Sequence, residues 1–177
     1  MNPALPPETF TTERLILRRP VEEDAEAIFS AWSQDPEVTK YLVWRPHASA
    51  SDALDHVRRA HASWEARQEF VWIFQLRGEA KLVGSLACRY NSHGVNLGYL
   101  LARPYWGQGL MAEALEPVVN SQAGVRRIWA TTDVENRASA RVLARAGFEL
   151  EGTLRSWEVH PNLGDEPRDS LCYCRCR

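Results

Sequence analysis

The sequence predicts one mixed α/β (α+β) domain in which a mostly antiparallel sheet carries helices on both faces. Three observations lead to this prediction: the chain carries both strand-like and helical spacings, apolar residues make up 45% of its 177 residues, and no repeat or linker divides it. Strands and helices alternate in the second half, which requires at least one parallel pair of strands. A chain of this length can bury a core without covalent cross-links.

Apolar residues at alternate positions predict the strands, and apolar residues three or four apart predict the helices. Strands are expected at 15–17, 70–76, 82–90, 95–101, 128–132, 153–159 and 170–176, and helices at 21–32, 51–66, 111–122 and 138–146. Pro20 ends the first strand because proline cannot donate to a ladder, and Gly147 suits the left-handed position that closes the last helix. Residues 1–11 are expected to be a tail, and 12–177 a single domain.

Composition and charge exclude several classes of protein. A formal net charge of −2 gives no general attraction to nucleic acid or anionic lipid. The longest apolar runs are far shorter than the roughly 18 residues of a membrane span. The first residues lack the pattern of a secretory signal, so we expect a cytoplasmic protein. Cys172, Cys174 and Cys176 share one face of the last predicted strand, but no fourth ligand lies near them in the sequence, and we expect no metal.

The segment from Trp106 to Ala112 follows a predicted strand and opens a predicted helix. Unpaired amides and the positive end of the helix dipole meet at such a place, and glycine at 107 and 109 lets a phosphate approach the backbone. Gly107, Gly109 and Ala112 also fit a dinucleotide fingerprint, with Asp133 as the ribose acid. The dinucleotide interpretation is weakened because the preceding strand ends an antiparallel meander, whereas a dinucleotide fold would begin a parallel unit there. The glycines alone leave three hypotheses open: a coenzyme A pyrophosphate, a dinucleotide, or a turn without a ligand.

Residues downstream separate these hypotheses. The run DVENRASARVLARAGFELEG at 133–152, together with TERLILRRP, EEDAEAIF and SQDPEV, resembles the GNAT superfamily of acetyl-CoA-dependent N-acetyltransferases. The likeness is closest to the Rim branch, which acetylates the N-terminal amines of ribosomal proteins, and it covers about residues 12 to 173. It implies a strongly twisted sheet with a splayed central strand pair. It also implies acetyl-CoA as co-substrate and direct attack of a primary amine on the thioester.

The resemblance places the cofactor at three parts of the chain. A bulged, splayed strand pairs with the pantetheine arm, loop amides bind the pyrophosphate, and an asparagine contacts the arm. The implied positions are Leu100, Leu101, Ala102, Trp106, Gly107, Gln108, Gly109, Leu110, Met111, Ala112 and Asn136. Met111 is bulkier than is usual in the superfamily. Asn136 could equally cap its helix, and Arg141 could reach a phosphate or lie on a solvated helix face.

The catalytic residues are less directly implied. Many relatives carry a tyrosine at the place of Leu143 to protonate the leaving thiolate, so that role must fall to another residue. Ser139 is the expected acid, although a serine that caps its own helix fits as well. Glu158, ten residues beyond Phe148, is the expected base, and His160 on the same strand face is a second candidate.

The acceptor side is expected between the two N-terminal helices, where Tyr41, Trp44 and Arg45 form a pocket for a primary amine. That amine could belong to a ribosomal protein N-terminus, another peptide or a small molecule. Glu113 is expected to stabilise its helix N-terminus rather than to catalyse. A homodimer is among the expected assemblies, since dimers are common in the family. The alternative functions are a dinucleotide-binding oxidoreductase and a non-catalytic acyl-CoA-binding module.

Overall fold

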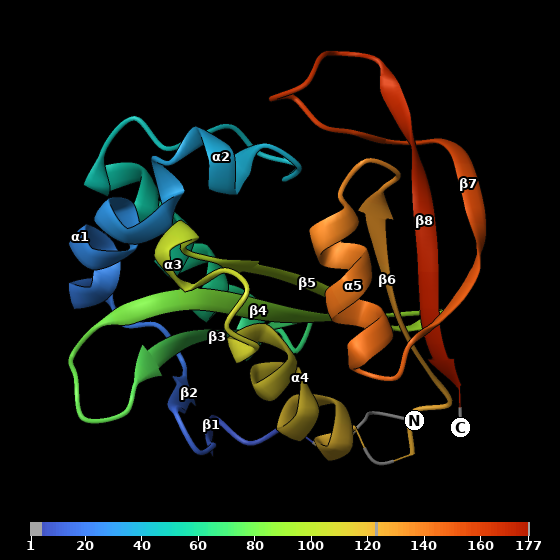
Figure 1. Ribbon diagram of the computed structural model, residues 1–177. Coiled ribbons are helices and arrows are strands. Elements are labelled where there is room, and N and C mark those ends of the chain that lie inside the picture. The colour runs from blue at the N-terminus through green and yellow to red at the C-terminus, as the bar shows by residue number, and fades with distance from the viewer. Residues whose placement is uncertain (1–4, 123, 177) are drawn as a thin grey trace.

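The computed structural model describes residues 5–122 and 124–176 and shows one eight-stranded sheet with helices on both faces (Figure 1). The strands, in sheet order, are β1 (Thr9–Thr11), β2 (Leu15–Arg18), β3 (Glu69–Leu76), β4 (Leu82–Asn91), β5 (Gly94–Leu101), β6 (Arg127–Asp133), β8 (Pro167–Cys176) and β7 (Glu149–Val159). All neighbouring strands are antiparallel except β5 and β6. The predicted mixed, mostly antiparallel sheet is confirmed.

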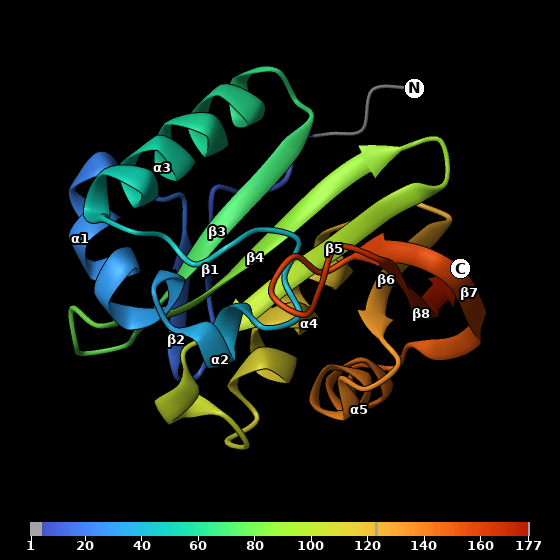
Figure 2. The same ribbon diagram turned by 90° about the horizontal axis from the view of Figure 1, so that it is seen from above.

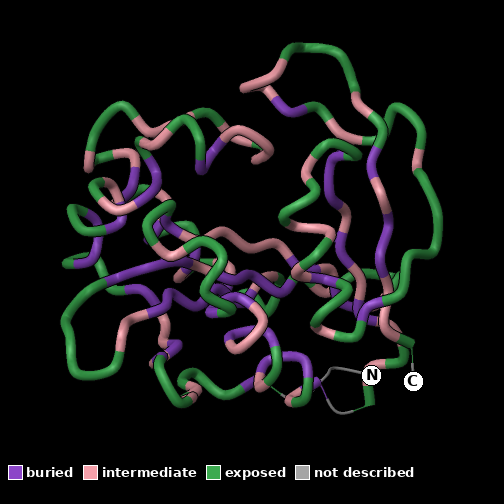
Figure 3. The backbone as a smooth tube through the Cα atoms, in the orientation of Figure 1, coloured by how far each residue is buried: buried purple, intermediate pink, exposed green. Residues whose placement is uncertain are grey.

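The helices divide between the two faces of the sheet (Figure 2). They are α1 (Ala25–Ile28), α2 (Pro36–Thr39), α3 (Ala50–Glu65), α4 (Leu110–Ser121) and α5 (Arg137–Arg145), with short 3-10 turns at Glu22–Asp24 and Arg103–Tyr105. Side chains alternate along β3. Trp72 and Phe74 therefore lie in the main core with α4, whereas Ile73 packs on the other face with Val57 of α3. Buried residues follow the central strands, and β7 at the sheet edge is largely exposed (Figure 3).

The central strand pair is splayed. β5 and β6 pair only at Val95↔Ile128 and Asn96↔Trp129. Beyond these two pairs β5 continues to Leu101 and β6 to Asp133, and the strands diverge (Figure 1). β6 stays paired with β8 along its whole length. β6, β8 and β7 therefore turn away from β5 as one unit. The gap between β5 and β6 is therefore open on the side where both strands end.

Two segments near the N-terminus differ from the prediction. The helix expected over 21–32 begins at the Val21 cap, where the Asp24 carboxylate accepts the Val21 amide, but its hydrogen-bond pattern changes along its length, from the 3-10 turn to α1 and then to a π-helical turn at Phe29–Ser33. Thr9–Thr11, expected in the tail, forms an edge strand on β2. The Phe10 ring, 5.7 Å from the Trp72 ring, holds it there. Residues 1–4 of the expected tail, and residue 177 of the domain, lie outside the described residues.

No helix in residues 5–122 and 124–176 has the length and apolar composition needed to cross a membrane.

Gly94 fixes the point where the splayed strands meet. Its φ is +112°, and an added Cβ would lie 2.1 Å from the Arg127 backbone oxygen, at the start of β6. We expect Gly94→Ala to lower the free energy of unfolding by about 3 kcal/mol, since backbone strain and a clash with main chain act together. The change is measured by urea denaturation.

Gly78 provides a matched control, because its φ is +80° and a Cβ there would meet nothing within 4 Å. Gly78→Ala should cost only the strain, about 1 kcal/mol. Equal losses for the two variants would show that close contact at Gly94 does not fix the strand pair.

Candidate active site

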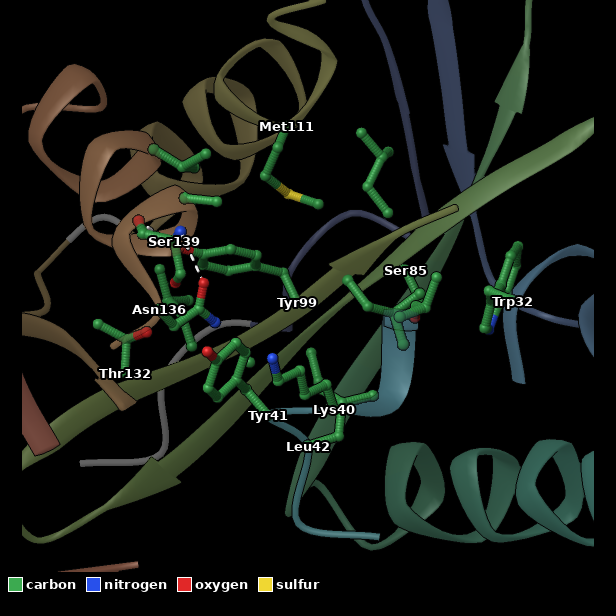
Figure 4. Close-up of a pocket in the computed structure, with 18 of the residues that line it drawn as sticks. Trp32, Lys40, Tyr41, Leu42, Ser85, Tyr99, Met111, Thr132, Asn136 and Ser139 are labelled. Carbon is green, nitrogen blue, oxygen red and sulfur yellow. Dashed lines mark hydrogen bonds between the residues drawn. The ribbon is translucent and has the colours of Figure 1, made fainter. Parts of the chain in front are cut away.

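A cavity of about 820 Å³ passes through the gap between the diverging ends of β5 and β6. On one face of the sheet it is lined by residues of α4 and α5, and on the other by the loop after α2 and by β3 and β4 (Figure 4). The side chains drawn around it include Met111 and Ser139 from the first group, and Tyr41 and Ser85 from the second. Two molecules could therefore approach the same gap from opposite faces of the sheet.

The glycine segment, Gly107 to Ala112, presents unpaired amides at the N-terminus of α4. Gly107 and Gly109 have φ of +77° and +79°, a region that favours glycine. Gly109 is the N-cap and has no side chain to accept the helix amides. The first helical hydrogen bond runs from the Glu113 amide to the Gly109 carbonyl, so the amides of residues 110–112 precede the ladder. This geometry, with the positive end of the helix dipole, suits an anion.

The side chains of this segment brace it. The Trp106 indole donates to the Leu101 carbonyl at 2.6 Å, and the Gln108 side-chain amide donates to the Pro104 carbonyl at 2.9 Å. Met111 is 5% exposed in the main core, which accommodates its bulk. The predicted contributions of Trp106, Gln108 and Met111 to an anion site are thus limited to their backbone.

Glu113 anchors the N-terminus of α4 to the connection between β1 and β2. Its carboxylate accepts the Arg14 amide at 2.8 Å and the Arg14 guanidinium at 2.7 Å. The same guanidinium donates to the Gln108 carbonyl at 3.0 Å. Although burial opposes ionisation, hydrogen bonds from Thr12 and Arg14 lower the pKa of Glu113. The residue expected to stabilise its helix N-terminus also ties that helix to the loop before it.

The β5 residues whose backbone faces the gap are Tyr99 and Leu101, and the Leu101 carbonyl already accepts the Trp106 indole. The Ala102 amide donates to the Val83 carbonyl at 2.8 Å. Because amides alternate in direction along an antiparallel ladder, Ala102 and Leu100 point their amides toward β4, while Leu101 and Tyr99 point theirs toward the gap. The register of β4 and β5 is continuous from Gly84↔Leu101 onward, without the bulge that the resemblance implied. The prediction that Leu100 and Ala102 offer backbone to a ligand therefore needs correction.

Asn136 and Ser139 lie together at the start of α5. Asn136 is the N-cap, and its side-chain oxygen accepts the Ser139 amide at 3.2 Å. Since Asn136 does the capping, the Ser139 hydroxyl is available for another partner, and it lies 2.8 Å from the Tyr99 hydroxyl (Figure 4). Leu143 is fully buried in the core, where it can contact no substrate. Arg141 is exposed at the rim of the cavity.

Glu158, near the end of β7, and His160, just beyond it, both line the cavity. β7 reaches this position through an irregularity between Leu154 and Glu158. Within it Ser156 has a φ of +45°, and its amide donates to Asp169 at 2.9 Å. Such bulges re-aim the side chains that follow. Glu158 is half-buried and His160 is 4% exposed.

Asp133 is a buried structural carboxylate rather than a free ribose acid. It accepts the Arg168 guanidinium at 2.6 Å and the Glu135 amide at 2.8 Å. Burial raises its pKa, but these hydrogen bonds outweigh burial, so the pKa of Asp133 is lowered. The antiparallel pairing of β5 with β4 also departs from a dinucleotide fold. The dinucleotide hypothesis therefore has no support in the structure.

The end of the cavity where the acceptor is expected is closed by a clasp between two loops. The Asn162 side-chain amide donates to the Thr39 carbonyl at 2.7 Å and to the Trp44 carbonyl at 2.8 Å. Tyr41 and Trp44 line the cavity beneath it. Arg45, which was also expected there, instead points outward, 3.7 Å from Asp165, with both side chains exposed. Its placement on the loop could be predicted, but the direction of its side chain could not.

Residues 14–149 match the family described as the acetyltransferase (GNAT) domain. The chain belongs to the GNAT acetyltransferase family. It is 32% identical over 152 residues to the uncharacterized N-acetyltransferase YoaA of Bacillus subtilis (strain 168), which covers 82% of this chain and 85% of the relative. It is 26% identical over 171 residues to the ribosomal protein uS5-alanine N-acetyltransferase of Escherichia coli (strain K12), with 86% and 84% covered.

The solved structure of the microcin C7 self-immunity acetyltransferase MccE, in complex with acetyl-CoA and AMP, shares the fold. Its TM-score is 0.86 at 20% identity, with 98% of each chain covered. Family membership identifies this chain as an acetyl-CoA-dependent N-acetyltransferase, and the predicted acyltransferase class is confirmed. The oxidoreductase alternative finds no support in these comparisons.

Two cavity residues of this acetyltransferase, Tyr99 and Lys40, and the clasp residue Asn162 are not among the site residues that the sequence predicts. Tyr99 immediately precedes the predicted segment 100–102, and the alternation of β5 could have pointed to it. Lys40 lies with its ammonium 5.3 Å from the Tyr41 ring centroid. Asn162 lies in a loop, where no periodic pattern marks a residue that contacts a segment about 120 positions away.

The cysteines of β8 do not form a metal centre. In the part of the chain that the structure describes, no group of three or more His, Cys, Asp or Glu side chains is placed to hold a metal ion. Cys172 is buried, Cys174 is half-buried and Cys176 is exposed. Burial raises the pKa of Cys174 to about 11, so this thiol stays protonated at neutral pH.

Two imidazoles border the acceptor end of the cavity. His47 and His56 lie with Trp44, with ring centroids between 5.0 and 6.4 Å apart. Burial lowers the pKa of His56 from 6.5 to about 4, and the positive charges of His47, Arg59 and Arg89 act in the same direction. Burial also lowers the pKa of His47. Both rings are therefore neutral at neutral pH.

Because the folded chain prefers neutral His56, the unfolded chain binds that proton more tightly. The stabilising contribution is complete above pH 6.5 and is lost as the pH falls toward 4. We expect the free energy of unfolding, measured by urea titration, to fall over this range, and to fall less in His56→Gln. Exposed His93 gives the control variant, His93→Gln. Identical pH dependence in His56→Gln and the unsubstituted protein would contradict the prediction.

Proposed function

We propose that this acetyltransferase modifies the α-amine at the N-terminus of a protein or peptide. The observation that carries the proposal is the length of the acceptor side of the cavity. Ser85, Ala87 and Arg89 project from one face of β4 and all line it. Four residues along a strand span about 13 Å, which is room for about four residues of an extended peptide. A small amine would leave most of this length unfilled.

The relatives support the same class of acceptor. One is the uS5-alanine acetyltransferase described above, and another is the ribosomal-protein-serine acetyltransferase of Escherichia coli (strain K12), 35% identical over 82 residues. The clasp formed by Asn162 also suits a chain end, because a free terminus can pass beneath two joined loops.

Acetyl-CoA fits the opposite face. We infer that its pyrophosphate binds the amides of the glycine segment, Gly107 to Ala112, at the N-terminus of α4. The pantetheine arm would pair with the backbone of Tyr99 and Leu101, which faces the gap. The Asn136 side-chain oxygen is used by the helix cap, which leaves its amide group to donate to the arm. Arg141 at the rim is placed for a phosphate.

The chemistry needs one base and one hydrogen-bond donor. Glu158 takes a proton from the acceptor ammonium, directly or through water, and the neutral amine attacks the thioester carbonyl. As the carbon–nitrogen bond forms and the carbon–sulfur bond breaks, Ser139 donates a hydrogen bond to the leaving sulfur. The ammonium gives up two protons in all: one ends on the coenzyme A thiol and the other passes from Glu158 to solvent, so the charges balance. His160, two residues after Glu158, is the second candidate for the base.

Substitution of the two proposed catalytic residues tests these roles. We expect Glu158→Gln to lower kcat about 100-fold and Ser139→Ala about tenfold, with the KM for acetyl-CoA nearly unchanged, because neither side chain holds the cofactor. The measurement is thiol release under saturating acceptor. Glu166→Gln, at an exposed carboxylate near the tip of the same hairpin, is the control. If both variants turn over at the unsubstituted rate, the roles are assigned to the wrong residues.

A panel of amines tests the acceptor class. Short peptides with a free N-terminal alanine or serine should be acetylated, whereas N-blocked peptides, a blocked peptide with an internal lysine, and polyamines should react slowly. We expect Asn162→Ala to raise the KM for the peptide about tenfold without changing that for acetyl-CoA, since two hydrogen bonds of the clasp are lost. Exposed Asn120 on α4 gives the control Asn120→Ala. Preference for polyamines over all free peptides would overturn the proposed acceptor.

A further inference from the structure

The Tyr99 hydroxyl is directed at the first turn of α5. It lies 2.8 Å from the Ser139 hydroxyl and 3.2 Å from the Ser139 carbonyl oxygen, and it comes from β5, on the other side of the splay (Figure 4). These contacts cross the gap at the place where the thioester is proposed to lie. The pair therefore borders the site of the reaction.

The direction of the hydrogen bond follows from the number of protons available. A serine hydroxyl has one proton and can accept two hydrogen bonds. If Ser139 donated to Tyr99, it would have no proton left for the leaving sulfur. If Tyr99 donates to Ser139, the serine proton is free to point into the cavity. Only the second arrangement is compatible with Ser139 as the donor.

Two features of Tyr99 favour it as the donor. Burial raises the pKa of the phenol, so it keeps its proton over the working pH range. Its two possible acceptors both belong to Ser139, and the hydroxyl is the closer of them. The Ser139 carbonyl lies within α5, where the amide four residues on is its regular partner. The Tyr99 hydroxyl therefore donates its hydrogen bond to the Ser139 hydroxyl oxygen.

We propose that Tyr99 is a positioning residue that makes Ser139 a hydrogen-bond donor to the leaving sulfur. The two hydroxyls act in series, because a hydroxyl that accepts a hydrogen bond is polarised and donates a stronger one. Neither hydroxyl loses its proton in this step: the sulfur receives its proton from the amine by way of the base. This inference rests on the proposed role of Ser139 and adds a residue on a different strand to it.

A double-mutant cycle tests the pair. We expect Tyr99→Phe to lower kcat about tenfold with an unchanged KM for acetyl-CoA, and Tyr99→Phe with Ser139→Ala to be no slower than Ser139→Ala alone. Tyr90→Phe is the matched control: it removes a half-buried phenol hydroxyl, bonded to Gln122, from the neighbouring strand. A kcat for Tyr99→Phe equal to that of the unsubstituted enzyme, or effects that multiply in the double variant, would overturn the proposal.

Fluorinated tyrosines at position 99 supply a readout that a structural role would not affect. They keep the size of the ring but make the phenol more acidic, and so a stronger donor until it ionises. We expect kcat at neutral pH to be maintained or raised, and activity to be lost at high pH only once the phenol is acidic enough to ionise there. A kcat at neutral pH that falls to that of Tyr99→Phe would overturn the proposal. If Tyr99→Phe is fully active while Ser139→Ala and Glu158→Gln are impaired, only this inference fails, and the proposed function stands.

Discussion

The two residue pairs that join β5 to β6 are the constraint on which the rest of the site depends. An ordinary parallel pair would continue to the ends of both strands, and the gap that holds the cavity would not exist. β5 pairs with β4, and β6 with β8, so each strand keeps one complete hydrogen-bond ladder. The opposite edge of each strand faces the gap between β5 and β6. Unpaired backbone groups away from water are costly, which makes the open edge of β5 a favourable place for a ligand with amide groups of its own.

The elements that carry chemistry lie at the ends of the splayed strands. The glycine segment and α4 follow β5, and α5 follows β6. The divergence of β5 from β6 therefore separates the N-terminus of α4 from that of α5. Charge is distributed accordingly. Glu113 and Asp133 are held by the guanidinium groups of Arg14 and Arg168 and serve the framework. The ladder neighbour of Glu158, Arg168, is occupied by Asp133 and Glu135, so this carboxylate borders the cavity without an arginine partner from β8.

Much of the fold could be predicted, because its strands and helices have regular spacing. The strands from Glu69 to Leu101 and the helices α4 and α5 lie close to their predicted places. The errors have physical causes. A change of hydrogen-bond pattern within the helical stretch, from 3-10 to α to π, leaves apolar residues at nearly helical spacing, and a three-residue edge strand at Thr9–Thr11 is too short to show a period.

The site was predictable to the extent that it depends on backbone. Glycines at 107 and 109 indicate a backbone with positive φ, and Asn136 indicates a helix cap. The direction of a side chain or an amide depends on tertiary contacts that no local pattern encodes. Hence Arg45 points to solvent although the sequence predicts it in the pocket, and the register of β4 turns the Leu100 amide away from the gap and those of its neighbours toward it.

The clasp of Asn162 has a consequence for how the molecule is made. It joins the N-terminal third of the chain to the hairpin of β7 and β8, so the acceptor side is complete only after that hairpin has docked. The glycine segment, by contrast, is braced by residues that precede it in the sequence, Arg14 and Pro104 among them. Since synthesis proceeds from the N-terminus, the glycine segment and its braces emerge before the hairpin that completes the clasp.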